Sequence, residues 1–121
     1  MPLGMNETLD KDHIIKALTG SIFSRNFLFY KSINSTNILA KELALKGAPE
    51  GTLILAEEQT EGKGRLNRKW VSRGNENLLF TILLRPNLNA ENIFPLTMIL
   101  ALSTIDAIKE MTGLNVLIKW P

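Results

Sequence analysis

The alternation of short apolar runs with helical segments limits this chain to folds in which helices pack on a β-sheet. From start to end, the sequence predicts a helix, a strand, a helix, two strands separated by a long loop, a helix and a last strand. These segments span residues 9–18, 27–33, 38–46, 52–57, 77–85, 92–112 and 115–120. This order indicates an α+β, or mixed α/β, fold class with one core, because 121 residues are too few for two comfortable domains.

Residues at the segment ends support these boundaries. A cluster of good helix-capping types, residues 34–37, stands in front of the second helix. The last helix has Pro95 near its start and Gly113 just past its end. The run at 77–85 is apolar on both faces, which predicts a central strand covered on both sides.

The rarest residue types exclude several classes of function. Cysteine is absent, and His13 is the only histidine. A disulfide framework, a thiolate nucleophile, a Ser-His-Asp triad and a metal site built on cysteine or several histidines are therefore not expected. The polar, acidic start of the chain does not resemble a signal peptide. The apolar stretch 93–108 is interrupted by polar residues and falls short of the ~20 residues of a membrane span. We expect a cytoplasmic protein without a membrane partner.

Positive charge is concentrated in one short segment. Residues 63–73 carry five basic side chains and no acidic one, so a net charge of +2 leaves −3 for the rest of the chain. A local cationic segment on a mildly acidic body indicates a small anionic ligand rather than a broad nucleic-acid surface.

This cationic segment lies in a polar stretch, residues 58–76, that has little periodicity. Loops of this length inside a compact domain are usually functional or disordered. The chemistry-bearing residues are Gly62, Lys63, Gly64, Arg65, Arg68 and Trp70. The glycines let a backbone approach a ligand, the basic side chains suit phosphate or carboxylate, and the tryptophan offers a flat face to a purine. The same residues also fit a solvated loop whose charges aid solubility.

Four motifs in order resemble the catalytic domain of biotin–protein ligases, within the wider biotin and lipoate ligase group. They are Ile33-Asn34-Ser35-Thr36-Asn37, Gln59 with Gly62-Lys63-Gly64-Arg65-x-x-Arg68-Lys69-Trp70, Asn77-Leu78-Leu79-Phe80-Thr81, and Ile118-Lys119-Trp120-Pro121. The family often has arginine or histidine in place of Lys63. The resemblance implies that residues 27–121 are the N-terminal part of a ligase catalytic domain, a class II synthetase-like mixed sheet packed with helices. Residues 1–26 would be an N-terminal helix and lead-in.

The resemblance implies an enzyme that uses biotin and ATP with Mg²⁺. The biotin carboxylate would attack the α-phosphate to give biotinyl-5′-AMP and pyrophosphate, and a lysine of a biotin carboxyl carrier protein would then take the biotin. Such chemistry depends on alignment of the reactants and on neutralisation of phosphate charge.

The resemblance also implies roles for individual residues. Biotin would be bound by Ser35, Thr36, Gln59 and Gly62. The nucleotide would be bound by Gly64, Arg65, Arg68 and Trp70. The catalytic charges would be Lys63, Arg65 and Arg68. We expect Arg65 to face the phosphate and retain the intermediate, and Trp70 to pack against adenine. Possible pocket residues are Asn37, expected more as a helix cap, and Lys119, equally suited to a structural role.

The family pattern continues past Pro121 with Asn-Asp and further pocket elements, so the resemblance predicts an incomplete site. A homodimer, a complementary C-terminal chain or a truncation would each account for this. No helix-turn-helix precedes Leu9, so a repressor function is not expected. Because Trp70 is the only aromatic residue among the basic side chains of the loop, we also expect no nucleic-acid partner. Two alternative functions stay open: a non-catalytic half-domain that binds biotin or a carrier protein, and a ligase for lipoate or another acyl group. Gln59 and the pair Ser35-Thr36 favour the ureido ring of biotin over the ring of lipoate.

Overall fold

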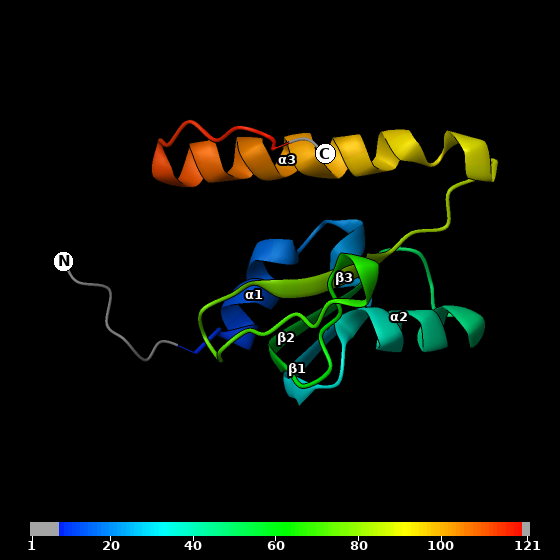
Figure 1. Cartoon of the computed structure of the whole chain (residues 1–121), viewed down its shortest axis with the longest axis horizontal. Helices are drawn as coiled ribbons and strands as arrows, with labels where there is room; N and C mark the ends of the chain where they lie inside the picture. The colour runs from blue at the N-terminus through cyan, green and yellow to red at the C-terminus, as the bar shows by residue number, and fades with distance from the viewer. Residues whose placement is uncertain (1–7, 120–121) are drawn as a thin grey trace. The chain divides into compact units, whose positions relative to one another are not determined.

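Three strands form one mixed sheet in the computed structural model, which describes residues 8–119 (Figure 1). The contacts divide the chain into two compact units, residues 1–85 and 86–121. The elements of the first unit are α1 (Lys11–Leu18), η1 (Ile22–Ser24), β1 (Phe27–Ile33), α2 (Thr36–Leu45), β2 (Thr52–Gln59), η2 (Arg65–Asn67) and β3 (Leu79–Leu83). Those of the second are η3 (Ala90–Asn92) and α3 (Phe94–Thr112). The expected fold class, α+β, is therefore confirmed.

The strand order in the sheet is β1-β2-β3. The first two strands are parallel and are joined by α2, whereas β2 and β3 are antiparallel. Leu28 pairs with Ile54, and Ile54 pairs with Thr81, so these three side chains point to the same face of the sheet. This face is covered by α2, which packs against β2 and β3. The fold therefore places the start of α2 over the middle of β3.

The core of the first unit is centred on β2. Ile54 and Ala56 are fully buried there, and the other buried apolar residues are Ala40, Leu55, Leu79 and Leu83. Because β2 has a hydrogen-bonded neighbour on each side, it is the central strand among residues 8–119. The expectation that the strand near 77–85 would be central was wrong, since β3 pairs on one side only and Phe80 stays 40% exposed.

The second unit consists of α3 and the short segments that flank it. The helix ends at Gly113, whose φ of 72° gives the left-handed cap that glycine adopts without strain. The strand expected at 115–120 is not formed over 115–119, where the residues pair with no strand, and Trp120 lies outside the described residues.

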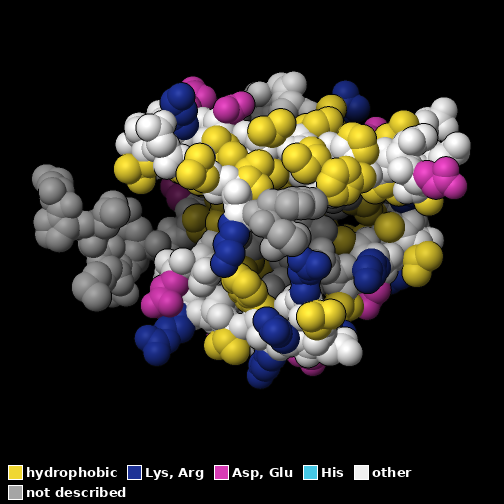
Figure 2. All heavy atoms as spheres, turned by 45° about the horizontal axis from the view of Figure 1, so that its top comes forward, with side chains coloured by type: hydrophobic (Ala, Val, Ile, Leu, Met, Phe, Trp, Pro, Cys, Tyr) yellow, Lys and Arg dark blue, Asp and Glu magenta, His cyan; other side chains and the backbone are white. Residues whose placement is uncertain are grey.

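Apolar side chains lie along the surface of α3 within its own unit (Figure 2). The exposed ones include Ile99, Leu100, Leu102 and Met111. By length and composition alone, residues 90–112 are sufficient to cross a membrane, a longer segment than the interrupted stretch 93–108 that was expected to fall short of a span. A core helix of a soluble protein meets the same criteria, so length and composition do not by themselves indicate a membrane span.

Candidate functional site

The carboxyl ends of the two parallel strands meet at the start of α2. Backbone hydrogen bonds continue past β1 and β2: Thr60 N donates to Ile33 O at 2.9 Å, and Glu61 N donates to Asn34 O at 2.8 Å. In sheets with parallel strands, this edge is where ligands usually bind, next to the N-terminus of the connecting helix. The fold therefore joins two motifs that lie more than twenty residues apart in the sequence.

A hydrogen-bond network fills this edge. The side-chain oxygen of Gln59 accepts from Thr36 N at 2.8 Å and from the Thr36 hydroxyl at 3.0 Å. Ser35 and Thr36 are both buried, and Ser35 occupies the N-cap position of α2 without a capping hydrogen bond from its side chain. Three of the four residues expected to bind biotin are thus brought together: Ser35, Thr36 and Gln59.

The donor and the acceptor of each hydrogen bond in this network follow from simple chemistry. A backbone N–H can only donate, so the atom of Gln59 that faces Thr36 N must be the amide oxygen and not the nitrogen. The Thr36 hydroxyl must then give its single hydrogen to the same oxygen. The Thr36 oxygen keeps its acceptor capacity, and the Gln59 amide nitrogen keeps two hydrogens. The edge therefore offers an acceptor beside a donor.

Two features of the network differ from the sequence prediction. Asn37 is not the helix cap, because α2 already begins at Thr36 and the N-cap is Ser35. The Asn37 side-chain oxygen instead lies 2.8 Å from the hydroxyl of Thr81 in β3, which is also 2.9 Å from the Thr36 hydroxyl. Sequence reasoning did not assign Thr81 to the site. A signal was present, since it is the only polar residue in the apolar run 78–84.

The cationic stretch is an ordered hairpin-like flap, residues 62–70, rather than a loop without structure. Lys63 and Lys69 form an antiparallel bridge, Trp70 N donates to Gly62 O at 2.8 Å, and Gly64 N donates to Arg68 O at 2.7 Å. Short-range alternation did not reveal this hairpin, because its tip contains the turn η2. There Leu66 and Asn67 adopt left-handed backbone angles, φ 57° and 60°.

Gly62 connects the flap to the network. It is buried, and a Cβ at this position would lie 2.8 Å from Trp70 O and 3.2 Å from the Gln59 amide nitrogen. The close approach leaves no room for a side chain. The free donor of Gln59 therefore lies directly beside the backbone of the flap.

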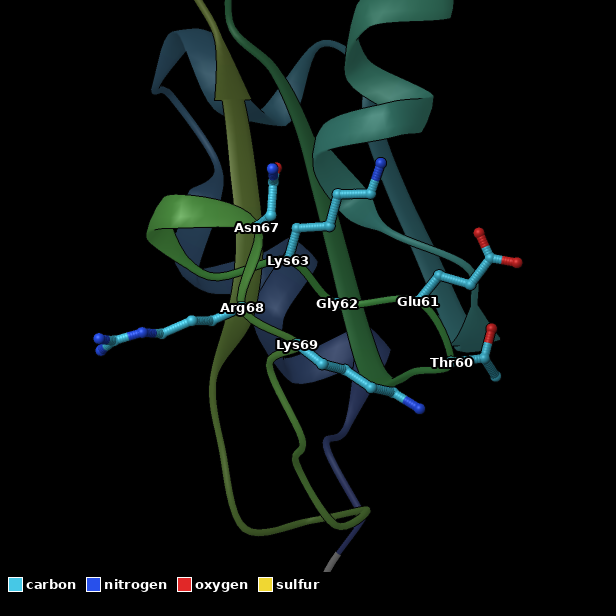
Figure 3. Close-up of a pocket in the computed structure, with 7 residues that line it drawn as sticks. All are labelled: Thr60, Glu61, Gly62, Lys63, Asn67, Arg68 and Lys69. Carbon is cyan, nitrogen blue, oxygen red and sulfur yellow. The ribbon is translucent and has the colours of Figure 1, made fainter.

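The flap borders an open cavity of about 410 Å³ (Figure 3). It is lined by Thr60, Glu61, Gly62, Lys63, Asn67, Arg68 and Lys69. In Figure 3 the side chains of Lys63 and Lys69 extend to the same side of the flap, while that of Arg68 points to the opposite side. The two lysine side chains that extend to the same side are suited to a phosphate or carboxylate.

The remaining predicted site residues are placed as follows. Arg65 is exposed in η2 and does not line the cavity, whereas Lys69, which the sequence did not single out, does. Trp70 is half exposed at the end of the flap. Lys119 is exposed and belongs to the second unit. Among residues 8–119, no group of three or more His, Cys, Asp or Glu side chains could hold a metal ion. The ligand roles of all these residues stay predictions.

Comparison with known proteins agrees with this geometry. The profile of the biotin/lipoate A/B protein ligase family matches residues 29–121. The bifunctional ligase/repressor BirA of Bacillus subtilis (strain 168) is 33% identical over 113 residues, which cover 93% of this chain and 35% of that protein. The biotin–[acetyl-CoA-carboxylase] ligase of Paracoccus denitrificans is 37% identical over 90 residues, 73% of this chain and 37% of that protein.

A solved structure gives the same result. The biotin protein ligase from Aquifex aeolicus, in complex with biotin and ATP, superposes with a TM-score of 0.66 at 36% identity. The superposition covers 80% of this chain and 40% of that one. This chain thus spans about a third to two fifths of the relatives it matches. The family match, the sequence identities and the fold agree, and the chain belongs to the biotin/lipoate A/B protein ligase family.

Proposed function

We propose that this chain contributes the biotin-binding network and the phosphate-binding flap of an ATP-dependent biotin–protein ligase. The observation that carries the proposal is the arrangement of hydrogen-bond donor and acceptor at the Thr36–Gln59 pair. It presents a hydroxyl oxygen as an acceptor beside an amide nitrogen that retains its hydrogens. One edge of a cyclic urea has the complementary pattern, with an N–H donor next to a C=O acceptor. The ureido ring of biotin therefore fits this edge.

The flap supports the second half of the proposal. Lys63 and Lys69 border a cavity that begins at Gly62, beside the Gln59 amide. A biotin molecule with its ring on the network would extend its carboxylate along the flap. The basic side chains would then neutralise both this carboxylate and the phosphates of ATP, which must approach each other despite their like charges.

The reaction assigned to this site has two steps. First, a carboxylate oxygen of biotin attacks the α-phosphorus of ATP, and pyrophosphate leaves. Second, the ε-amine of a carrier-protein lysine attacks the carbonyl carbon of biotinyl-5′-AMP, and AMP leaves as an amide forms and a proton is released. The flap would favour the first step by holding the two anions in line and would retain the mixed anhydride until the carrier arrives.

Magnesium fits the proposal as a companion of the nucleotide. Since residues 8–119 contain no cluster of three ligating side chains, the ion would be held chiefly by phosphate oxygens and water, as is usual for Mg²⁺ with ATP. When bound, it would supply further neutralisation of phosphate charge.

Calorimetric titration of the chain with biotin and with lipoate tests the substrate assignment. Both acids carry a similar carboxylate tail, but the dithiolane ring of lipoate has no N–H donor or carbonyl acceptor. We expect binding of biotin and at least tenfold weaker binding of lipoate. Equal or tighter binding of lipoate would reassign the site to the lipoate branch of the family.

A further inference from the structure

We infer that Thr81 is a positioning residue for ligand recognition. It holds the Thr36 hydroxyl in the orientation in which its oxygen can accept a hydrogen bond from the ligand. The inference rests on the proposed function and adds to it a residue in β3. Thr81 is separated from Thr36 by 45 residues in the sequence, yet their hydroxyl oxygens are 2.9 Å apart.

The hydrogens in the network can be assigned one by one. The Thr36 hydroxyl gives its hydrogen to Gln59, as argued above, so the hydrogen between the two threonine oxygens must come from Thr81. A threonine hydroxyl has only one hydrogen. The Thr81 hydroxyl also lies 2.8 Å from the side-chain oxygen of Asn37, so it has two acceptors within reach.

This arrangement explains how the site stays satisfied both without and with a ligand. Without a ligand, Thr81 donates to Thr36 and occupies one of the two acceptor lone pairs of its hydroxyl oxygen. When a ligand N–H donates to Thr36 instead, the Thr81 hydroxyl can turn to Asn37 without losing its hydrogen bond. A partly buried polar group that always keeps a partner avoids the cost of an unpaired donor. Thr81 therefore keeps the Thr36 hydroxyl oxygen in the role of an acceptor and leaves this oxygen available to an N–H group of the ligand.

The surroundings favour a role specific to the network over a general packing role. Thr81 interrupts an otherwise apolar run, and its side chain shares a face with Leu28 and Ile54 beneath α2. Valine would fill the same space on this face and would be the expected residue for packing alone. Packing alone therefore does not explain the hydroxyl of Thr81, whereas a role in the hydrogen-bond network does.

The test is a double-mutant cycle on the full chain, with biotin affinity measured by calorimetry and folding checked by circular dichroism and thermal unfolding. We expect Thr81→Val to weaken biotin binding about tenfold, the loss of one well-placed hydrogen bond. Thr81→Ser should restore affinity to within about threefold of wild type. Because Thr81 acts through Thr36, Thr81→Val should add little to the loss caused by Thr36→Val.

The outcomes separate this inference from the function on which it rests. Wild-type affinity in Thr81→Val, or fully additive losses in the double variant, would overturn the role of Thr81 and leave the proposed function intact. Failure of the wild-type chain to bind biotin would overturn both. If Thr81→Val does not fold, Thr81→Ala in the same cycle gives the comparison, and failure of Thr81→Ser to restore binding would contradict the inference.

Discussion

The side-chain oxygen of Gln59 accepts two hydrogen bonds from Thr36, one from its backbone N–H at 2.8 Å and one from its hydroxyl at 3.0 Å. It thereby satisfies the first N–H of α2, which the side chain of Ser35 leaves uncapped. The two ends of one amide thus serve different purposes: the oxygen supports the fold, and the nitrogen is turned toward the flap.

Gln59→Glu separates these two purposes. Glutamate keeps an oxygen for Thr36 but replaces the donor nitrogen by a second acceptor, so the fold should persist while biotin affinity falls at least tenfold. Gln59→Ala should lose both and, in addition, lower the free energy of unfolding by about 1 kcal/mol, as a lost helix cap does. Calorimetry and urea denaturation measure the two effects. Wild-type biotin affinity in Gln59→Glu would show that the nitrogen does not face the ligand.

Gly62→Ala tests the close contact between the flap and the network. The added Cβ would meet Trp70 O at 2.8 Å and the Gln59 nitrogen at 3.2 Å, so either the flap or the amide must shift. We expect biotin affinity to fall several-fold or more with little change in melting temperature, because the flap is not part of the core. Gly74→Ala is the matched control, since a Cβ there meets nothing within 4 Å. Equal affinities of the two variants would contradict the account.

Arg65→Ala tests the charge at the flap tip. Arg65 is exposed and lies outside the cavity, so its expected contact with the adenylate phosphate requires movement of the flap on ligand binding. We expect release of biotinyl-AMP to accelerate about tenfold, the loss of a charge-assisted hydrogen bond, while unfolding is unchanged. Arg73→Ala, in the same basic segment but beyond the flap, should release the adenylate at the wild-type rate. Identical release rates in all three proteins would remove the role assigned to Arg65.

Gly51→Ala tests the packing at the start of β2, at the opposite end of this strand from Gln59. Its φ of 83° favours glycine, and a Cβ would lie 2.7 Å from the backbone oxygen of Ile22. Gly47 has a similar φ of 85° but open space around it. We expect Gly47→Ala to lower the free energy of unfolding by about 1 kcal/mol and Gly51→Ala by about 2–4 kcal/mol, because only the second adds a steric clash. Denaturation by urea measures both, and equal losses would mean that the contact with Ile22 relaxes freely.

Local signals in the sequence predicted most of the first unit. The aromatic run that forms β1 was predicted at its observed bounds, Phe27–Ile33, and the start of β2 at Thr52 was also correct. Both strands owe their position to apolar side chains that follow the pleat of the sheet. Pro95 and Gly113 likewise marked the start and end of the long helix within two residues.

Features that depend on partners distant in sequence were not predicted correctly. An apolar run on both faces indicated a central strand, but the position of β3 in the sheet depends on which strands pair, and sequence patterns do not encode that directly. The strand predicted after Gly113 failed for the same reason, because strand formation depends on pairing with another strand. In the site, the contact of the Thr81 hydroxyl with Thr36 depends on the packing of α2 over β3, which the sequence pattern does not reveal. The hairpin of the flap depends on left-handed backbone angles at residues 66 and 67, neither of which is glycine.

The most direct test of the central claim is adenylate formation by this chain. The purified protein would be incubated with ATP labelled at the α-phosphate, Mg²⁺ and either biotin or lipoate, and the labelled products separated. The account predicts labelled biotinyl-AMP with biotin and little labelled product with lipoate. Labelled lipoyl-AMP in place of biotinyl-AMP would contradict it, whereas no adenylate of either acid from a folded chain that binds biotin and ATP would contradict catalysis by this chain alone and leave the proposed contribution of the network and the flap in place.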